Sequence, residues 1–173
     1  MKKLFAIVTF IALATAAFAQ KAGDKVSFSS MDMAGNAVTS DIFAKNKLTM
    51  VNIWGTFCPP CIREMPDLAK LNSANKSNGV EVIGIPIDIV DRKGNVVPYT
   101  KADGDAIIKQ TGADYTHVVP TKAMMDGFLK NVQVVPSTLF VDKNGKIVGQ
   151  VYLGARSQKD WQKIIDSLLS KQK

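Results

Sequence analysis

Only two cysteines occur in this chain of 173 residues, and they lie three positions apart in Cys58-Pro59-Pro60-Cys61. The pair directly follows the apolar run Leu48 to Trp54, which has the composition of a buried strand. Proline is tolerated in the first turn of a helix, where its missing N–H would have no partner. An apolar face at helical spacing then follows. We therefore predict a strand that leads through the cysteines into a helix.

A close cysteine pair could be a structural disulfide, half of a zinc site or a redox couple. Cross-linking a loop of about four residues stabilises a fold by only roughly 2 kcal/mol, against roughly 4.7 for a 100-residue loop. A zinc site needs further ligands, and the chain has no other cysteine and the single histidine His117. The sequence favours a redox couple, and we predict neither a metal nor a cofactor.

The position of the motif assigns a role to each cysteine. A thiol attacks a disulfide as its thiolate, and Cys58 would lie at the helix N-terminus, where free N–H groups favour negative charge. Such sites lower a thiol pKa from about 8.5 to between roughly 3.5 and 7.5. Cys61 lies one turn into the helix. We expect Cys58 to be the exposed nucleophile and Cys61 to resolve the mixed disulfide.

The N-terminus has the pattern of an export signal. Two lysines precede an apolar run that ends in Ala17-Phe18-Ala19, a small-x-small cleavage pattern, so we predict a signal peptide over residues 1–19. A retained membrane anchor is the alternative, but the run of about 15 residues is shorter than the roughly 20 that a spanning helix needs. Residues 20–173 then form one domain, predicted to be soluble in the periplasm or another extracytoplasmic space.

The charge of the chain is positive but dispersed. The formal net charge is +7, and removal of the predicted signal peptide lowers it to about +5. Basic residues are scattered and do not form a run with interleaved aromatics, so we expect no nucleic-acid partner. We expect a monomer.

The order of elements indicates an α/β domain with a central mixed sheet flanked by helices and an N-terminal β-hairpin extension. Asn144-Gly145 favours a tight hairpin turn, and Ser157 is a candidate cap for the last helix. Pro66 is expected to kink the first helix. The remaining expected elements are a hairpin over 26–43, a strand over 80–90, a short helix over 104–110, a strand over 115–119, a helix over 121–129 and a hairpin over 137–153.

The stretch Asn-Ile-Trp-Gly-Thr-Phe-Cys-Pro-Pro-Cys-Ile-Arg-Glu-Met-Pro, residues 52–66, resembles the TlpA/ResA/DsbE branch of the thioredoxin superfamily. That branch has a Trp-Gly pair before the cysteines, then a Glu three residues after the second cysteine, then Pro. Glu64 and Pro66 match those two positions. Thioredoxin has a buried Asp where this chain has Asn52, which fits the branch and not the cytosolic reductase. The resemblance implies a thioredoxin-like fold.

The resemblance also implies further site residues. Glu64 would move the proton of the second thiol, with a solvated helix residue as the alternative. Val135-Pro136 would form a cis peptide bond facing the cysteines, and Val135 would present backbone groups to an extended substrate. Trp54 matches an aromatic position near the motif, where packing is an equally good explanation. His117 we expect at a strand end or on the surface, without a catalytic role.

These observations predict an exported thiol-disulfide oxidoreductase that acts on protein disulfides or dithiols. The resemblance favours a reductase recharged by a membrane thiol-electron donor, with a possible part in cytochrome c maturation. A disulfide oxidase or isomerase of the same fold is the alternative, because the sequence does not contain the reduction potential. A peroxidase of the AhpC/TSA type is disfavoured, since Gly55 and Val51 stand where it would need Thr or Ser and Pro. A copper carrier would prefer a longer cysteine spacing with a supporting histidine.

Overall fold

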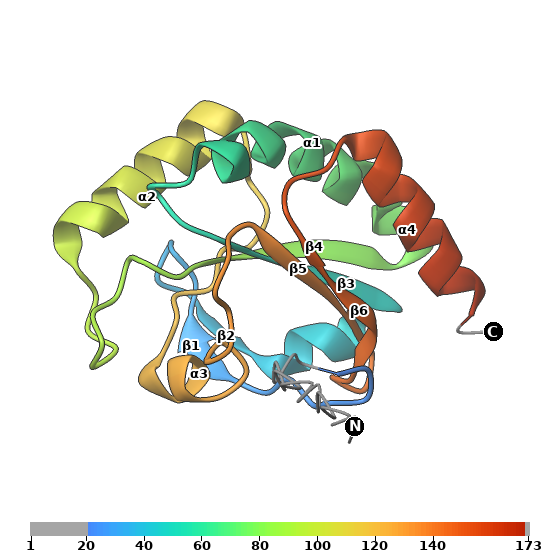
Figure 1. The fold of residues 1–173 in the computed structure, drawn as a ribbon, viewed down its shortest axis with the longest axis horizontal. Helices are drawn as coiled ribbons and strands as arrows, with labels where there is room; N and C mark the ends of the chain where they lie inside the picture. The colour runs from blue at the N-terminus through green and yellow to red at the C-terminus, as the bar shows by residue number, and fades with distance from the viewer. Residues whose placement is uncertain (1–20, 172–173) are drawn as a thin grey trace, which may run out of the picture.

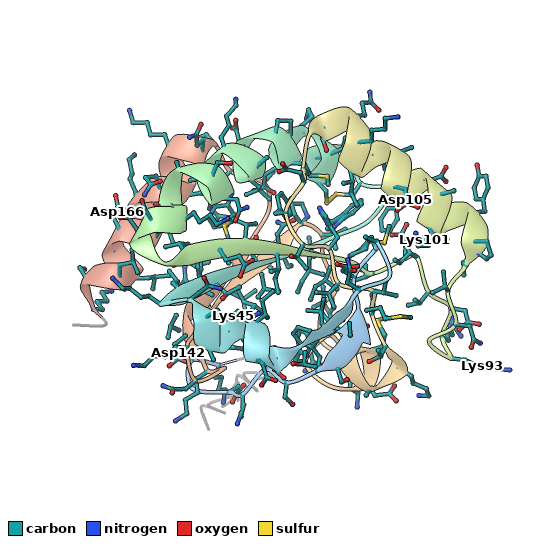
Figure 2. The ribbon with its side chains drawn as sticks, turned by 180° about the vertical axis from the view of Figure 1, so that it is seen from behind. Lys45, Lys93, Lys101, Asp105, Asp142 and Asp166 are labelled. Atoms are coloured by element: carbon teal, nitrogen blue, oxygen red, sulfur yellow. A yellow bond between two sulfur atoms is a disulfide. The ribbon has the colours of Figure 1, made fainter. Side chains whose placement is uncertain are left out.

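The computed structural model describes residues 21–171, so the predicted signal peptide lies outside the described residues. Figure 1 shows a sheet with helices over one face and a smaller layer over the other. The four-stranded sheet has the order β4-β3-β5-β6. Figure 2 shows the side chains from behind, with Lys101, Asp105 and Asp166 on the outside of the helices. No helix within the described range is both long and apolar enough to cross a membrane.

The central strand is β3 (Leu48–Trp54), and all seven of its residues are buried. It pairs in parallel with β4 (Val80–Pro86) and antiparallel with β5 (Ser137–Asp142), which gives the predicted mixed sheet. β6 (Ile147–Leu153) returns beside β5 through the predicted hairpin. A strand with apolar residues on both sides needs cover on both faces, and the two layers supply it.

Three helices form the layer above the sheet in Figure 1: α1 (Pro59–Asn75), α2 (Pro98–Thr111) and α4 (Gln158–Ser170). Their apolar side chains join the sheet in one core cluster, which includes both cysteines. Trp161 of α4 is fully buried in that cluster. Ser157 caps α4 by accepting a hydrogen bond from the Asp160 N–H at 3.3 Å, as predicted.

The opposite face carries a second core cluster. It is covered by the hairpin of β1 (Ser29–Met31) and β2 (Ala37–Thr39), the 3-10 helix η1 (Ser40–Lys45) and the short helix α3 (Lys122–Asp126). The N-terminal hairpin is confirmed, and Gly35 in its turn has a φ of 90°. Met124 is buried in this cluster, which agrees with a packing role for the methionines of α3.

Several boundaries differ from the prediction. β4 ends at Pro86 and not at residue 90, because β3 ends at its partner Trp54 and offers no further neighbour. α2 begins at Pro98 and is longer than the predicted helix over 104–110, since a proline at the first position favours a helix start. α3 is shorter than predicted. α1 continues through Pro66, and a second 3-10 helix, η2 (Lys76–Asn78), follows it.

The segment 115–119 is not a full strand, contrary to the prediction. It touches the outer edge of β4 through one bridge, between Gly84 and His117. The Gly84 N–H donates to Thr116 O and the Val118 N–H donates to Gly84 O, both at 2.8 Å. On the far edge of the sheet, Gly23 N–H donates to Ile147 O at 2.8 Å.

Candidate active site

Cys58 and Cys61 lie where β3 passes into α1, and they form a disulfide with a sulfur–sulfur distance of 2.06 Å. Cys58 is the N-cap residue of α1, and its Sγ accepts a hydrogen bond from the Cys61 N–H at 3.2 Å. Both side chains are buried, but Cys58 is 5% exposed and Cys61 only 1%. The N-cap position favours negative charge on the Cys58 sulfur after reduction, because the Cys61 N–H donates to it and it lies at the positive end of the helix dipole, although Pro59 and Pro60 supply no N–H.

The Val135-Pro136 peptide bond is cis, as predicted. The carbonyl oxygen of Val135 lies 3.6 Å from Cys58 Sγ, so this loop faces the cysteine pair. Because the two segments are 77 residues apart in the chain, the sheet order is what brings them together.

Two exposed apolar side chains adjoin these elements. Phe57 immediately precedes Cys58 and is 66% exposed, and Val134 immediately precedes Val135 and is 51% exposed. Neither residue carries a sequence signal other than its adjacency to a motif residue.

Glu64 is buried in α1, one helical turn beyond Cys61, and only 3% of its surface is exposed. The alternative of a solvated helix residue is therefore wrong. Burial raises the pKa of the Glu64 carboxyl above its usual value, although hydrogen bonds from Trp161 and the Arg156 backbone oppose that shift. Residues three apart on a helix are neighbours, and Trp161, which donates to the Glu64 carboxyl, belongs to the same core cluster as Cys61.

Trp54 is fully buried, which supports the packing explanation for this residue. Its indole N–H donates to His117 Nδ1 at 3.2 Å. His117 is only 3% exposed, so the expectation of a surface position for it is wrong. The imidazole fits against Gly84, where a Cβ atom would come within 2.2 Å of Nδ1.

Two polar contacts near the motif had no signal in the sequence. The Thr56 N–H and hydroxyl both donate to the carboxylate of Asp88, with the N–H at 3.0 Å from Oδ1. Asn52 is buried and its amide donates to Thr138 Oγ1 at 3.1 Å, so it ties β3 to β5 below the site. Within residues 21–171 no three His, Cys, Asp or Glu side chains gather closely enough to hold a metal ion.

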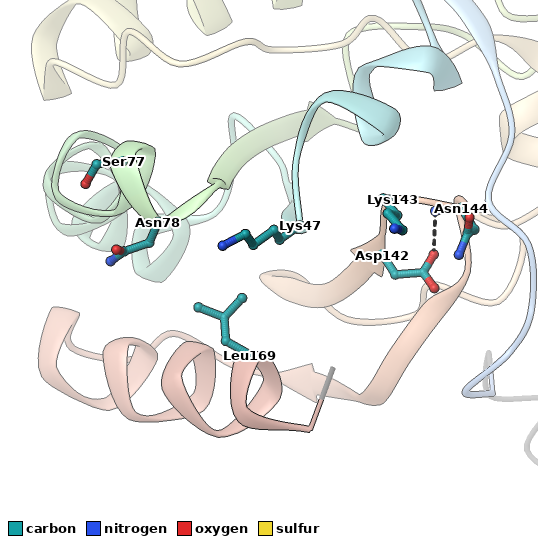
Figure 3. Close-up of a pocket in the computed structure, with 7 residues that line it drawn as sticks. All are labelled: Lys47, Ser77, Asn78, Asp142, Lys143, Asn144 and Leu169. Carbon is teal, nitrogen blue, oxygen red and sulfur yellow. Dashed lines mark hydrogen bonds between the residues drawn. The ribbon is translucent and has the colours of Figure 1, made fainter. Parts of the chain in front are cut away.

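A hollow lies at the other end of the sheet, near the start of β3 and the end of β5 (Figure 3). β3 is seven residues long, so its two ends are roughly 20 Å apart. The cysteines do not line this hollow. Its lining residues are Lys47, Ser77, Asn78, Asp142, Lys143, Asn144 and Leu169.

The Redoxin family model matches residues 19–165. The chain belongs to the Redoxin family. Its relatives include the thiol-disulfide oxidoreductase ResA of Halalkalibacterium halodurans, 28% identical over 147 residues that cover 80% of this chain and 72% of that protein. ResA of Geobacillus kaustophilus is 26% identical over 72% of this chain, which spans 64% of that relative.

Among solved structures, a thiol:disulfide interchange protein of the thioredoxin family from Chlorobium tepidum superposes with a TM-score of 0.71. It is 24% identical, and the match covers 86% of this chain and 97% of the other. At that identity the likeness shows the thioredoxin fold. With the ResA relatives, it makes this Redoxin family member a thioredoxin-like thiol-disulfide oxidoreductase of the TlpA/ResA/DsbE type.

Proposed function

We propose that this protein works outside the cytoplasm as a reductase of disulfides in exported proteins, with Cys58 and Cys61 as its redox couple. The observation that carries the proposal is the pair's position at the N-terminus of α1, with Cys58 Sγ facing the Val135 carbonyl across the cis-proline loop. The leader-like sequence of residues 1–19 supports export.

In the proposed cycle the Cys58 thiolate of the reduced protein attacks one sulfur of a substrate disulfide. A bond forms between Cys58 and that sulfur, and the other substrate sulfur leaves as a thiolate. Cys61 then loses its proton and attacks Cys58 Sγ, which breaks the mixed disulfide. The substrate leaves as a dithiol and has gained two electrons, and the Cys58–Cys61 disulfide remains. A membrane-bound thiol carrier, oxidised in its turn, would return the two electrons.

The other predicted site residues fit this cycle. Glu64, with its raised pKa, would accept the proton of Cys61 before the second attack. The backbone of Val135 and the ring of Pro136 would hold an extended substrate segment beside Cys58, and the exposed Phe57 and Val134 would contact its apolar side chains. Trp54, which is fully buried and hydrogen-bonded to His117, would have a packing role without touching substrate.

A trapping experiment tests the roles of the two cysteines. Cys61→Ser protein should accumulate mixed disulfides with a reporter protein through Cys58, because the resolving thiol is missing. Cys58→Ser protein is the matched control and should accumulate few. Equal trapping by both variants would contradict the assignment of nucleophile and resolving thiol.

The direction of the reaction is tested by equilibration with glutathione. A reductase should have a potential nearer the roughly −270 mV of thioredoxin than the roughly −120 mV of a strong oxidant. A value near the latter would replace our proposal by the oxidase alternative. An apocytochrome c peptide with an internal disulfide is a suitable first substrate, since cytochrome c maturation is one process such a reductase could serve.

A further inference from the structure

The two oxygens of the Glu64 carboxyl have very different surroundings. Oε1 accepts one hydrogen bond from the indole N–H of Trp161 and a second from the backbone N–H of Arg156, the latter at 3.1 Å. Oε2 is buried and has no hydrogen-bond partner among the residues that the structure describes. Both donors come from the C-terminal end of the chain, 92 and 97 residues beyond Glu64.

This asymmetry determines where a proton can reside. An oxygen that already accepts two N–H bonds has used both of its lone pairs, so a proton added there would have to displace a donor. Oε2 has both lone pairs free. The neutral acid therefore has Oε1 as its carbonyl oxygen and Oε2 as its hydroxyl oxygen.

The groups around the carboxyl leave it without an ion pair. The Arg156 guanidinium lies over the rings of Trp161 and Tyr152, at 5.0 and 5.3 Å from their centres. It donates to the carbonyl oxygens of Leu153 and Gly154, so its charge acts on Glu64 only from a distance.

Two uncharged polar groups complete the surroundings. The Asn52 amide favours the ionised carboxylate. Tyr115 is buried, and both burial and the charge of Glu64 raise the pKa of its hydroxyl. Neither group donates a hydrogen bond to Oε2, because that oxygen and the Tyr115 hydroxyl both lack a hydrogen-bond partner within residues 21–171.

We propose that Trp161 is a positioning residue for thiol-disulfide exchange, which holds Glu64 Oε1 so that Oε2 is the oxygen that takes the proton of Cys61. This inference rests on the proposed function, since it specifies how Glu64 would act there. In the resolving step the proton passes from Cys61 Sγ to Oε2, and its electron pair stays on the sulfur. That pair forms the bond to Cys58 as the substrate sulfur leaves as a thiolate, which takes a proton from solvent.

The chain is suited to a direct test because it contains only two glutamates, Glu64 and Glu81. Carbon-13 labelling of glutamate therefore gives two side-chain carboxyl signals. Trp161→Phe removes one donor to the carboxylate and should raise the pKa of Glu64 by about one unit, because a lost hydrogen bond to the charged form disfavours that form. The Glu81 signal should not move. Ile165→Val, one turn further along α4, is the control for loosened packing and should leave both signals unchanged.

The kinetic readout separates this inference from the proposed function. The pH at which the resolving step accelerates should shift in Trp161→Phe by the same amount as the Glu64 signal, and the first attack by Cys58 should shift less. An unchanged Glu64 pKa overturns the role of Trp161, whatever the kinetics show. A shifted Glu64 pKa with an unshifted resolving step, together with normal resolution by Glu64→Gln, overturns the proposed role of Glu64 in the reaction.

A second test uses the wild-type protein alone and so does not depend on whether a variant folds. Its two tryptophans give two indole N–H signals. The Trp161 signal should move downfield with the same pKa as the Glu64 carboxyl, because its acceptor gains charge as Oε1 and Oε2 share the negative charge. The Trp54 indole, bonded to His117, is the internal control. A Trp161 signal that does not follow the Glu64 titration overturns the proposal.

Discussion

His117 uses both ring nitrogens inside the protein. Nδ1 accepts from the Trp54 indole, so Nε2 carries the hydrogen and donates it to Ala113 O at 2.9 Å. Burial lowers the pKa of His117 to about 4, because no counter-charge compensates for the loss of water around the imidazolium. A lone histidine gives no signal of such an environment, since its partner Trp54 lies 63 residues away on β3. The cysteines and Pro136, by contrast, were predictable from short local patterns.

The buried neutral His117 should make stability depend on pH. The unfolded chain binds a proton near pH 6.5 and the folded protein only near pH 4, so this histidine's contribution is present above about pH 6.5 and is lost as the pH falls toward 4. Between about pH 7 and pH 5 the loss should be roughly 2 kcal/mol. His117→Gln should lack it. The pKa of Glu64 is raised, so its contribution to stability grows as the pH falls, opposite to that of His117. Because Glu64 is present in both proteins, this contribution cancels in the comparison.

Urea unfolding of both proteins at the two pH values measures this difference. If the free energy of unfolding falls equally in the wild type and in His117→Gln between pH 7 and pH 5, His117 is not held neutral in the folded protein. Gln can still donate to Ala113 O, so the variant keeps part of the hydrogen bonding.

At the level of elements, the sequence predicted the helices and strands that have a strong local pattern. β3, the β5–β6 hairpin and α4 follow from hydrophobic period and turn residues. The prediction of a full strand over 115–119 was wrong: the apolar residues fit a strand pattern, but the segment makes only single bridges, from His117 to Gly84 of β4 and from Val118 to Asp32. The contacts of Glu64 with Arg156 and Trp161 join α1 to α4 across more than 90 residues, and no local pattern encodes them.

The start of α4 allows a test of one helix alone. Ser157→Ala should lower the free energy of unfolding by about 1 kcal/mol, because it removes the oxygen that accepts the Asp160 N–H at the cap. Ser167→Ala, at an exposed interior position of α4, should be neutral or slightly stabilising. Thermal or urea unfolding compares the two. Equal losses would mean that the cap contributes nothing specific.

At the level of the whole molecule, the sheet separates the redox site from the second core. Both cysteines belong to the cluster under α1 and α4, and Phe43 of η1 is buried on the opposite face. Its ring packs edge-on against Phe28 with the centres 5.8 Å apart. Phe43 therefore packs in the second core, whereas Phe57 beside the cysteines is mostly exposed.

A pair of phenylalanine variants tests this separation. Phe43→Ala should cost about 3–5 kcal/mol of stability, because it leaves a cavity in a packed core. Its rate of reducing a protein disulfide should be unchanged where the variant is still folded. Phe57→Ala should change stability by within about 0.5 kcal/mol and slow the reduction of protein disulfides more than that of a small disulfide. The reverse pattern in unfolding and turnover assays would contradict the assignment.

The segments that hydrogen-bond to the two edge strands of the sheet also affect how readily the protein could aggregate. An open edge strand is a template to which a second copy can add a strand. On β4 the backbone groups of Gly84 are already taken by Thr116 and Val118, and on β6 those of Ile147 are taken by Gly23 and Asp24. Gly149, with a φ of 73°, further interrupts the extended course of β6. A second copy would therefore have to displace these segments of the protein's own chain at Gly84 or Ile147 before it could add a strand there.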